Sequence, residues 1–322
     1  MLGNDTKSNP DPMEQIIVVT GPTAAGKTEL SLRLAESIDA EIINGDAMQC
    51  YRGLDIGTAK PSSAERQVVP HHLFDLWAVT QTATVADYQR HGRARAKEIW
   101  SRGRRVVVVG GSPLYLRALC DVLEIPPQDL ALRAELMARA ESEGGGVLHR
   151  ELAERDPEAA AAIDSRNVRR VVRALEVVRL TGSFTARLPT PQAWRPTLWL
   201  GIDLPRPELD DRITLRADSM WAGGLLEETE TMMRQGLAEG ETARKAVGYE
   251  QAMAVLAGDM SRDNGVAETV TATRRLARRQ QRTLHRDDRI CWLSAEDKLA
   301  AAISAVSEFS ATVDKTQSPT AD

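Results

Sequence analysis

Cysteine is scarce and long apolar runs are missing, and each absence excludes a class of protein. The three cysteines, Cys50, Cys120 and Cys291, lie far apart without paired spacing, which argues against a zinc site or a disulfide framework. No apolar run approaches the roughly 20 residues that a membrane-spanning helix needs. The polar first residues lack the apolar segment of a secretory signal. We therefore expect a cytoplasmic protein that makes no membrane contact.

The composition is otherwise that of a soluble globular protein. The chain has 322 residues, of which 42% are hydrophobic and 27% are charged, enough for a full core and two domains. Residues 1–14 and 310–322 are predicted to be disordered ends.

Residues 21–28 read G-x-x-x-x-G-K-T and follow an apolar run at 16–19, which predicts a short buried strand. This pattern is typical of a phosphate-binding loop, whose backbone N–H groups turn inward around a di- or triphosphate. Lys27 would supply a mobile positive charge, and the Thr28 hydroxyl would help to hold a magnesium ion. The predicted phosphate site comprises Gly21, Pro22, Thr23, Ala24, Ala25, Gly26, Lys27 and Thr28.

Short apolar strands alternate with helices through the first 120 residues. Further strands are predicted at 40–44, 106–109 and 197–205, and a charged amphipathic helix over 85–101. This alternation predicts an α/β fold with a P-loop doubly wound parallel sheet, whose ligands bind at the carboxyl ends of the strands. After Pro205 the chain reads as helical from Asp210 to about Leu293.

An all-helical segment interrupts the sheet pattern. Residues 123–195 contain no strand signal and are bounded by proline-rich stretches. We expect this segment to be a helical domain inserted into a catalytic core formed by residues 15–122 and 196–295.

Arginine is clustered although the net charge is −5. Neither cluster has matching acids four residues away, and clustered arginine on helices favours contact with a nucleic-acid backbone. A solvated helix face is the alternative, and it would usually explain a single run. The first cluster comprises Arg274, Arg275, Arg278, Arg279, Arg282 and Arg286, and the second Arg166, Arg169, Arg170, Arg173 and Arg179.

The chain lacks the acid that most P-loop nucleotide hydrolases place at the end of a second strand. The strand at 106–109 runs into Gly110-Gly111-Ser112 instead, and there is no NKxD-like guanine reader. Asp46 follows the strand at 40–44, at the same edge of the sheet as the phosphate-binding loop. Its carboxylate could act as a general base or hold a metal, and stabilising a turn is the alternative.

Five segments, in order, resemble the tRNA dimethylallyltransferases, also called tRNA isopentenyltransferases. The resemblance extends from about Ile16 to Leu293. It implies transfer of a dimethylallyl group from dimethylallyl diphosphate to N6 of the adenine beside the anticodon of tRNA, with Mg²⁺ and by a monomer. The segments are residues 21–28 (GPTAAGKT), 44–61 (NGDAMQCYRGLDIGTAKP), 70–75 (PHHLFD), 108–119 (VVGGSPLYLRAL) and 163–182 (IDSRNVRRVVRALEVVRLTG).

The resemblance also implies roles for individual residues. Asp46 matches the general base that removes the proton of the adenine amine, and Thr23 and Arg216 match residues placed against the diphosphate and its bridging oxygen. The phosphate-binding loop would then hold the donor's diphosphate, and no ATP would be hydrolysed. Residues implied to contact tRNA are Asp46, Ala47, Met48, Gln49, Ser112, Arg133, Arg169, Arg170 and Arg173. The inserted domain would bind the anticodon stem-loop.

Three positions depart from the family pattern: Pro113 in GGSPLY, Glu250 in AVGYEQ and Thr283 in place of a tryptophan. They bear on the tRNA contacts and not on the reaction.

Two other functions remain open on the sequence. A P-loop small-molecule kinase would use ATP through the same loop, but it leaves the arginine clusters and the helical insertion unexplained. A nucleic-acid-binding protein without catalysis would have a vestigial loop.

Overall fold

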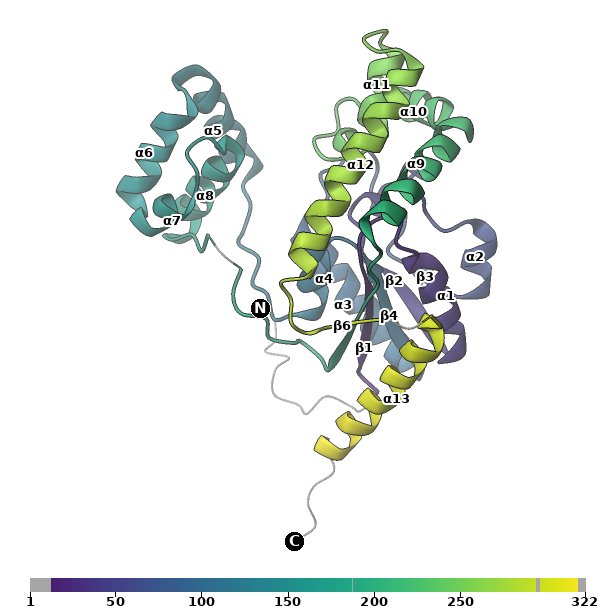
Figure 1. The fold of residues 1–322 in the computed structure, drawn as a ribbon. Helices are drawn as coiled ribbons and strands as arrows, with labels where there is room; N and C mark the ends of the chain where they lie inside the picture. Colours follow the sequence, from purple (N-terminus) through teal and green to yellow (C-terminus); the bar gives the residue numbers. More distant parts are fainter. Residues whose placement is uncertain (1–12, 187, 294–295, 318–322) are drawn as a thin grey trace. The chain divides into compact units, whose positions relative to one another are not determined.

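The computed structural model describes residues 13–186, 188–293 and 296–317, which fall into two compact units (Figure 1). The first unit takes the described residues up to Val122 and from Ala193 onward, and the second is Leu123–Gln192. Residues 193–195, which the sequence placed in the insertion, belong to the first unit. The Trp194 N–H donates to the Cys120 carbonyl (2.7 Å), which ties this segment to the sheet unit.

The first unit is built on a six-stranded sheet whose neighbouring strands are all parallel, which confirms the predicted fold class. The strand order is β3-β2-β4-β1-β5-β6, so successive strands extend first to one side of β1 and then to the other. Ligands of such sheets bind where the direction of winding changes. The strands are β1 (Ile16–Thr20), β2 (Ala40–Asn44), β3 (His71–His72), β4 (Arg105–Gly110), β5 (Thr197–Gly201) and β6 (Ile290–Trp292).

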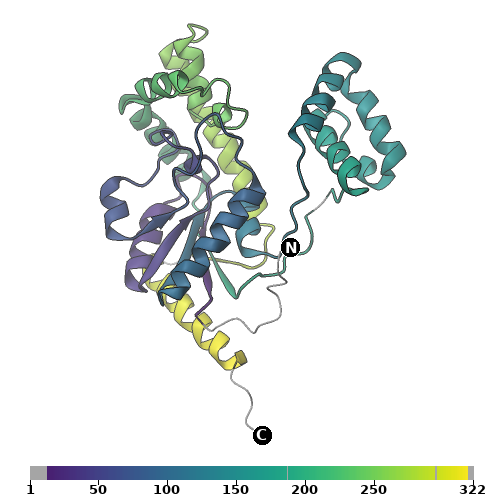
Figure 2. The same ribbon diagram turned by 180° about the vertical axis from the view of Figure 1, so that it is seen from behind.

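Alternate residues of β1 enter two separate cores, because side chains along a strand point to opposite faces. Ile16 and Val18 join one buried cluster, and Ile17 and Val19 join the other. Helices α3 (Val85–Ser101) and α4 (Pro113–Cys120) contribute to the first cluster, and α1 (Lys27–Ser37) and α13 (Lys298–Gln317) to the second. Figures 1 and 2 accordingly show α1 and α3 on opposite faces of the sheet.

The chain between β5 and β6 is helical and forms a cluster of packed helices (Figure 1). The long helix α12 packs against both α9 and α11, which carries its side chains from this cluster toward the sheet. No described helix is long and apolar enough to cross a membrane. The helices of this cluster are α9 (Arg206–Ala222), α10 (Leu225–Arg234), α11 (Tyr249–Leu256) and α12 (Arg262–Leu284). The remaining short elements of the first unit are the helix α2 (Ser63–Val68), which precedes β3, and the 3₁₀ segments η1 (Met48–Cys50) and η2 (Ala243–Lys245).

The second unit is a separate bundle with its own apolar core. Leu136, Leu148, Leu152 and Leu175 are fully buried in it. Its helices are α5 (Leu130–Glu143), α6 (Gly145–Arg155), α7 (Pro157–Ala162) and α8 (Val168–Thr181).

Three sequence predictions need correction at the ends of the chain. The segment before Leu293 contains the strand β6, not a continuous helix, because Ile290 and its neighbours pair with β5. Residues 310–317, predicted to be disordered, end α13, whose Val313 is buried and whose Ser310 donates to Gln15 (3.0 Å). Of the predicted disordered N-terminus, Glu14 pairs with Arg195 (2.6 Å); residues 1–12 and 318–322 lie outside the described residues.

Candidate active site

The carboxyl ends of three strands bring the predicted chemical groups together. The phosphate-binding loop follows β1, Asp46 follows β2, and Gly111 and Ser112 follow β4. Parallel strands end at one edge of a sheet, so groups far apart in sequence meet there.

The phosphate-binding loop needs its glycines for backbone reasons. A Cβ on Gly21 would lie 2.3 Å from the Ile202 carbonyl oxygen, so only glycine fits between β1 and β5. Gly26 has φ of +96°, a left-handed conformation that glycine adopts without strain, and it begins helix α1. The helix therefore directs its free N–H groups and the positive end of its dipole toward the loop.

Lys27 is held within the loop with a reduced affinity for its proton. Its Nζ donates to the Pro22 carbonyl (2.7 Å). Burial lowers the pKa of Lys27 to about 8, and the nearby Arg216 cation adds to this effect while Asp46 opposes it. Burial also lowers the pKa of Arg216, again opposed by Asp46. Two cations are thus gathered beside one carboxylate, an arrangement that favours binding of a further anion.

Asp46 has one carboxylate oxygen engaged and one left for chemistry. Its Oδ1 accepts from the Met48 N–H (2.9 Å), and its own N–H donates to the Asn44 side chain (2.9 Å). Among the described residues, none donates to Oδ2. A turn-stabilising role and a general-base role would therefore use different oxygens of the same side chain.

Asp46 lies where two cavities meet. One cavity, of about 380 Å³, is lined by the phosphate-binding loop, including Lys27 and Thr28. The other, of about 260 Å³, is lined largely by side chains of α9 and α12, among them Ile213 and Leu276. Five residues line both cavities: Thr23, Asp46, Thr58, Arg216 and Gln280. All three predicted catalytic residues, Asp46, Thr23 and Arg216, are therefore brought together at this junction.

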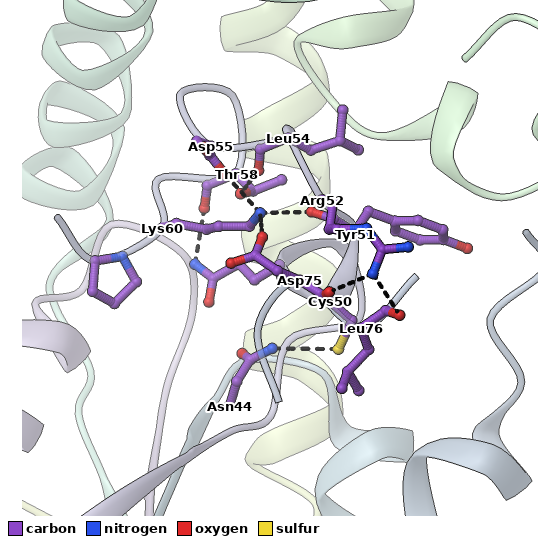
Figure 3. Close-up of polar contacts among 12 residues, drawn as sticks. Asn44, Cys50, Tyr51, Arg52, Leu54, Asp55, Thr58, Lys60, Asp75 and Leu76 are labelled. Atoms are coloured by element: carbon purple, nitrogen blue, oxygen red, sulfur yellow. Dashed lines mark hydrogen bonds and ion pairs between the residues drawn. The ribbon is translucent and has the colours of Figure 1, made fainter. Parts of the chain in front are cut away.

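A rigid loop carries Thr58 to the junction. Lys60 fixes its far end: Nζ donates to the Tyr51 carbonyl and to Asp55 and Asp75, each at 2.6 Å, and its side chain is 1% exposed (Figure 3). The charged contacts neutralise a buried ammonium that would otherwise be costly.

Helices α10 and α11 hold the same loop from the other side. Glu228 accepts from the Ile56 N–H (3.0 Å), and the Tyr249 hydroxyl accepts from the Gly57 N–H (3.1 Å) while it donates to Glu228. A Cβ on Gly57 would lie 2.4 Å from the Tyr249 ring, so this position has no room for a side chain.

Gln49, which the resemblance places against tRNA, also serves this loop. Its Nε2 donates to the Thr58 carbonyl (3.0 Å) and the Ala59 carbonyl (3.1 Å). Gln49 lines the loop-side cavity, whereas Ala47 and Met48 line the other. Their contact with tRNA stays a prediction.

The three departures from the family pattern are accommodated locally. Pro113 is the first residue of α4, where a proline costs nothing because that N–H has no helical partner. Ser112 precedes it and lines the helix-side cavity of about 260 Å³, together with Asp46. Glu250 lies in the first turn of α11, where an acid favours the helix dipole, and Thr283 is exposed on α12.

The predicted tRNA-binding arginines of the second unit are not alike. Arg133 and Arg173 both donate to Glu176, a fully buried carboxylate, at 2.7 Å and 2.9 Å. Arg170 donates to the Ala186 carbonyl, and Arg169 is exposed with no partner among the described residues. No acid stands four residues from any arginine of this cluster, as the sequence showed, but an acid three residues away and acids on other helices do pair with it.

The residues around Thr28 fit a magnesium ion that is held mainly by a substrate. Mg²⁺ in phosphate sites takes one or two protein oxygens, substrate oxygens and waters. The Thr28 hydroxyl has no partner among the described residues, and the carboxylates of Asp46 and Glu65 line the same cavity. No group of three acidic, histidine or cysteine side chains in the described chain would bind a metal alone.

We expect kcat/KM for an anionic substrate of this loop to fall as the pH rises above about 8. In the free protein Lys27 loses its proton near pH 8, so the attraction for an anionic substrate weakens above it. The decline should approach about tenfold per pH unit. Initial rates across pH, with any second substrate saturating, measure this decline. Lys27→Arg is the control, because arginine stays charged over this range and should lack the decline; the same midpoint in that variant would exclude Lys27.

A family model and two related proteins match the amino-acid sequence over most of the chain. A family model described as IPP transferase matches residues 49–287. A tRNA dimethylallyltransferase of Streptomyces avermitilis is 50% identical over 288 residues, which cover 89% of this chain and 92% of that one. One of Thermobifida fusca is 49% identical over 306 residues, covering 92% and 96%.

Solved structures agree with the fold. A tRNA isopentenylpyrophosphate transferase from Bacillus halodurans superimposes with a TM-score of 0.69 and 33% identity, covering 94% of this chain and 99% of that chain. A eukaryotic dimethylallyltransferase, solved acting on tRNA, gives a TM-score of 0.73 at 23% identity, covering 96% and 81%, which supports the fold alone.

Proposed function

The chain belongs to the IPP transferase family, and we propose that it transfers a dimethylallyl group from dimethylallyl diphosphate to N6 of the adenine beside the anticodon of tRNA. The observation that carries the proposal is the position of Asp46 between two cavities, one of them lined by a phosphate-binding loop. Two substrates that enter from opposite sides would meet at this carboxylate.

The reaction needs a base because an exocyclic adenine amine is a poor nucleophile. Its lone pair is delocalised into the ring, and its proton must leave as the new C–N bond forms. Oδ2 of Asp46 is the acceptor that the turn leaves open. The base would be turned out of the anticodon-loop stack to reach it, as in other enzymes that modify bases.

The leaving group is a diphosphate, which accumulates negative charge as its bond to carbon breaks. Lys27, Arg216 and the N-terminus of α1 face the cavity where that charge develops. A magnesium ion, bound by Thr28 and the diphosphate itself, would neutralise further charge. The diphosphate therefore occupies Gly21 to Thr28, and no nucleotide is consumed.

Exposed arginines of the second unit and of α12 would each contact phosphates of the tRNA. Arg169 and the exposed α12 residues Arg275, Arg279 and Arg282 have no carboxylate partner among the described residues. Arginines of this kind are available to phosphates, whereas Arg133 and Arg173 are already held by Glu176. We further propose that the enzyme works in the cytoplasm as a monomer.

Transfer should proceed in a buffer that contains magnesium and no nucleotide. Inorganic pyrophosphate should compete with the donor, because both present a diphosphate to the same loop. Lys27→Ala should raise the KM for the donor or lower kcat while tRNA binding survives. These rates are measured with radiolabelled donor and bulk tRNA. A P-loop kinase would instead require ATP, so a rate that stops without ATP, or ATP hydrolysis that tracks product, would contradict the proposal.

A further inference from the structure

Gln280 is buried where the two cavities meet, although it comes from α12, far along the chain from the phosphate-binding loop. Its side chain is 6% exposed, and it lines both cavities together with Thr23, Asp46 and Arg216. A polar side chain buried to this extent is expected to use its hydrogen-bonding groups. The two ends of its amide have different surroundings.

The orientation of the amide follows from its one bond. The Thr23 N–H lies 2.9 Å from Oε1 of Gln280, and an N–H group can donate only to the oxygen of an amide. The NH₂ group must therefore point away from the Thr23 backbone. Among the described residues, none accepts from Nε2, and this nitrogen is not fully enclosed by protein. It is open to the cavity.

Gly111 shows which cavity the NH₂ group faces. A Cβ on Gly111 would lie 2.7 Å from Nε2 of Gln280, so the nitrogen rests directly against the glycine that follows β4. Gly111 lines the cavity of the phosphate-binding loop and not the other. The NH₂ group of Gln280 thus lies on the side where Lys27 and the N-terminus of α1 contribute positive charge.

We propose that Gln280 is a catalytic residue whose Nε2 donates a hydrogen bond to the diphosphate as it departs, while its Oε1 holds Thr23 in place. The proposal rests on the proposed function, because it concerns the leaving group of that reaction. As the carbon–oxygen bond of the donor breaks, its electron pair stays on the diphosphate oxygen. An N–H group that already points at that oxygen stabilises the negative charge without any rearrangement of the protein.

Two substitutions separate the two ends of the amide. Gln280→Glu retains an oxygen that can accept from the Thr23 N–H, but it replaces the NH₂ group with a negatively charged oxygen. Gln280→Met removes both groups at similar length. Loss of one such donor typically lowers kcat by about 10²- to 10³-fold, so both variants should lose at least about 10²-fold. The dissociation constant of inorganic pyrophosphate, measured by calorimetry, should rise at least about tenfold in Gln280→Glu, whereas that of tRNA should not change.

Gln251→Glu is the matched control. Gln251 also accepts a backbone N–H through its side-chain oxygen, from Gly248 at 2.8 Å, but it lines neither cavity. This variant should keep the parent's kcat and pyrophosphate affinity.

Three results would overturn the proposal. If Gln280→Glu keeps the parent's kcat while Gln280→Met does not, the residue acts only by holding Thr23. If tRNA affinity falls and pyrophosphate affinity does not, Nε2 faces the base. Equal activity of all variants excludes any role for the amide. These outcomes require an active parent, so a parent that transfers no prenyl group refutes the proposed function instead.

Discussion

Asp46→Asn should lower turnover by about 10²- to 10⁴-fold, the usual contribution of a general base. An amide keeps the shape of the side chain and can still accept from the Met48 N–H, so the turn after β2 should be preserved. The proton acceptor facing the cavities is lost. Single-turnover rates with saturating tRNA and donor isolate the chemical step, and tRNA affinity should change little.

Asp203→Asn is the control for this substitution. Asp203 follows β5 by two residues, as Asp46 follows β2, and its carboxylate accepts from Gln281 (2.7 Å) and pairs with His285. It lines neither cavity, so its amide variant should retain near-parent turnover. Near-parent turnover of purified Asp46→Asn would remove Asp46 from the mechanism.

Glu176→Ala should destabilise the second unit by about 3 kcal/mol, at the lower end of the cost of breaking a buried ion pair. Glu176 is fully buried and accepts from Arg133, Arg173 and the Asp129 N–H (2.8 Å), so its loss leaves two arginines without their carboxylate. These arginines are about one quarter exposed, at 25% and 23%, and water partly compensates them. Hydrogen exchange of amides in α5 and α8 measures the effect, because the unit contains no tryptophan.

The stability of the second unit should also depend on pH through the carboxylate of Glu176. Burial would raise the pKa of Glu176, but the hydrogen bonds from Arg173, the Asp129 N–H and Arg133 outweigh it, so the pKa lies below its usual value of 4.5. A lowered folded-state pKa contributes stability above pH 4.5 that is lost as the pH falls through the folded value. Glu135→Ala is the control, since Glu135 pairs with Arg179 from an exposed position and should contribute little. Equal protection in both variants would show that Glu176 does not stabilise the unit.

The core of the site could be predicted because its signals are short in sequence. Residues 21–28 carry the phosphate-binding pattern within one turn, and Asp46 follows directly after a strand whose end is fixed by the parallel sheet. The helix over 85–101 was predicted with the bounds that the structure has, because a clear amphipathic repeat begins at an N-capping threonine, Thr84.

Residues that reach the site from distant elements could not be predicted in this way. Gln280 lies 257 positions after its partner Thr23, and Thr58 depends on a buried lysine and on two helices. The pairing of Arg179 with Glu151 could not be predicted for the same reason, since only the folded bundle brings that acid to α8; the pair of Arg173 with Glu176 lies within α8 at a spacing of three residues, outside the four-residue spacing that was considered. β6 was missed because three residues carry no periodic signal, and its strand conformation depends on pairing with β5.

The most direct test weighs the product. Purified protein is incubated with bulk tRNA, dimethylallyl diphosphate and magnesium in nucleotide-free buffer, and the tRNA is digested to nucleosides and analysed by mass spectrometry. The account predicts an adenosine heavier by one dimethylallyl group, with the added group on N6, and a parallel ribonuclease digest to oligonucleotides should place it beside the anticodon. Unmodified adenosine throughout, or a phosphorylated small molecule formed only with ATP, would contradict the account.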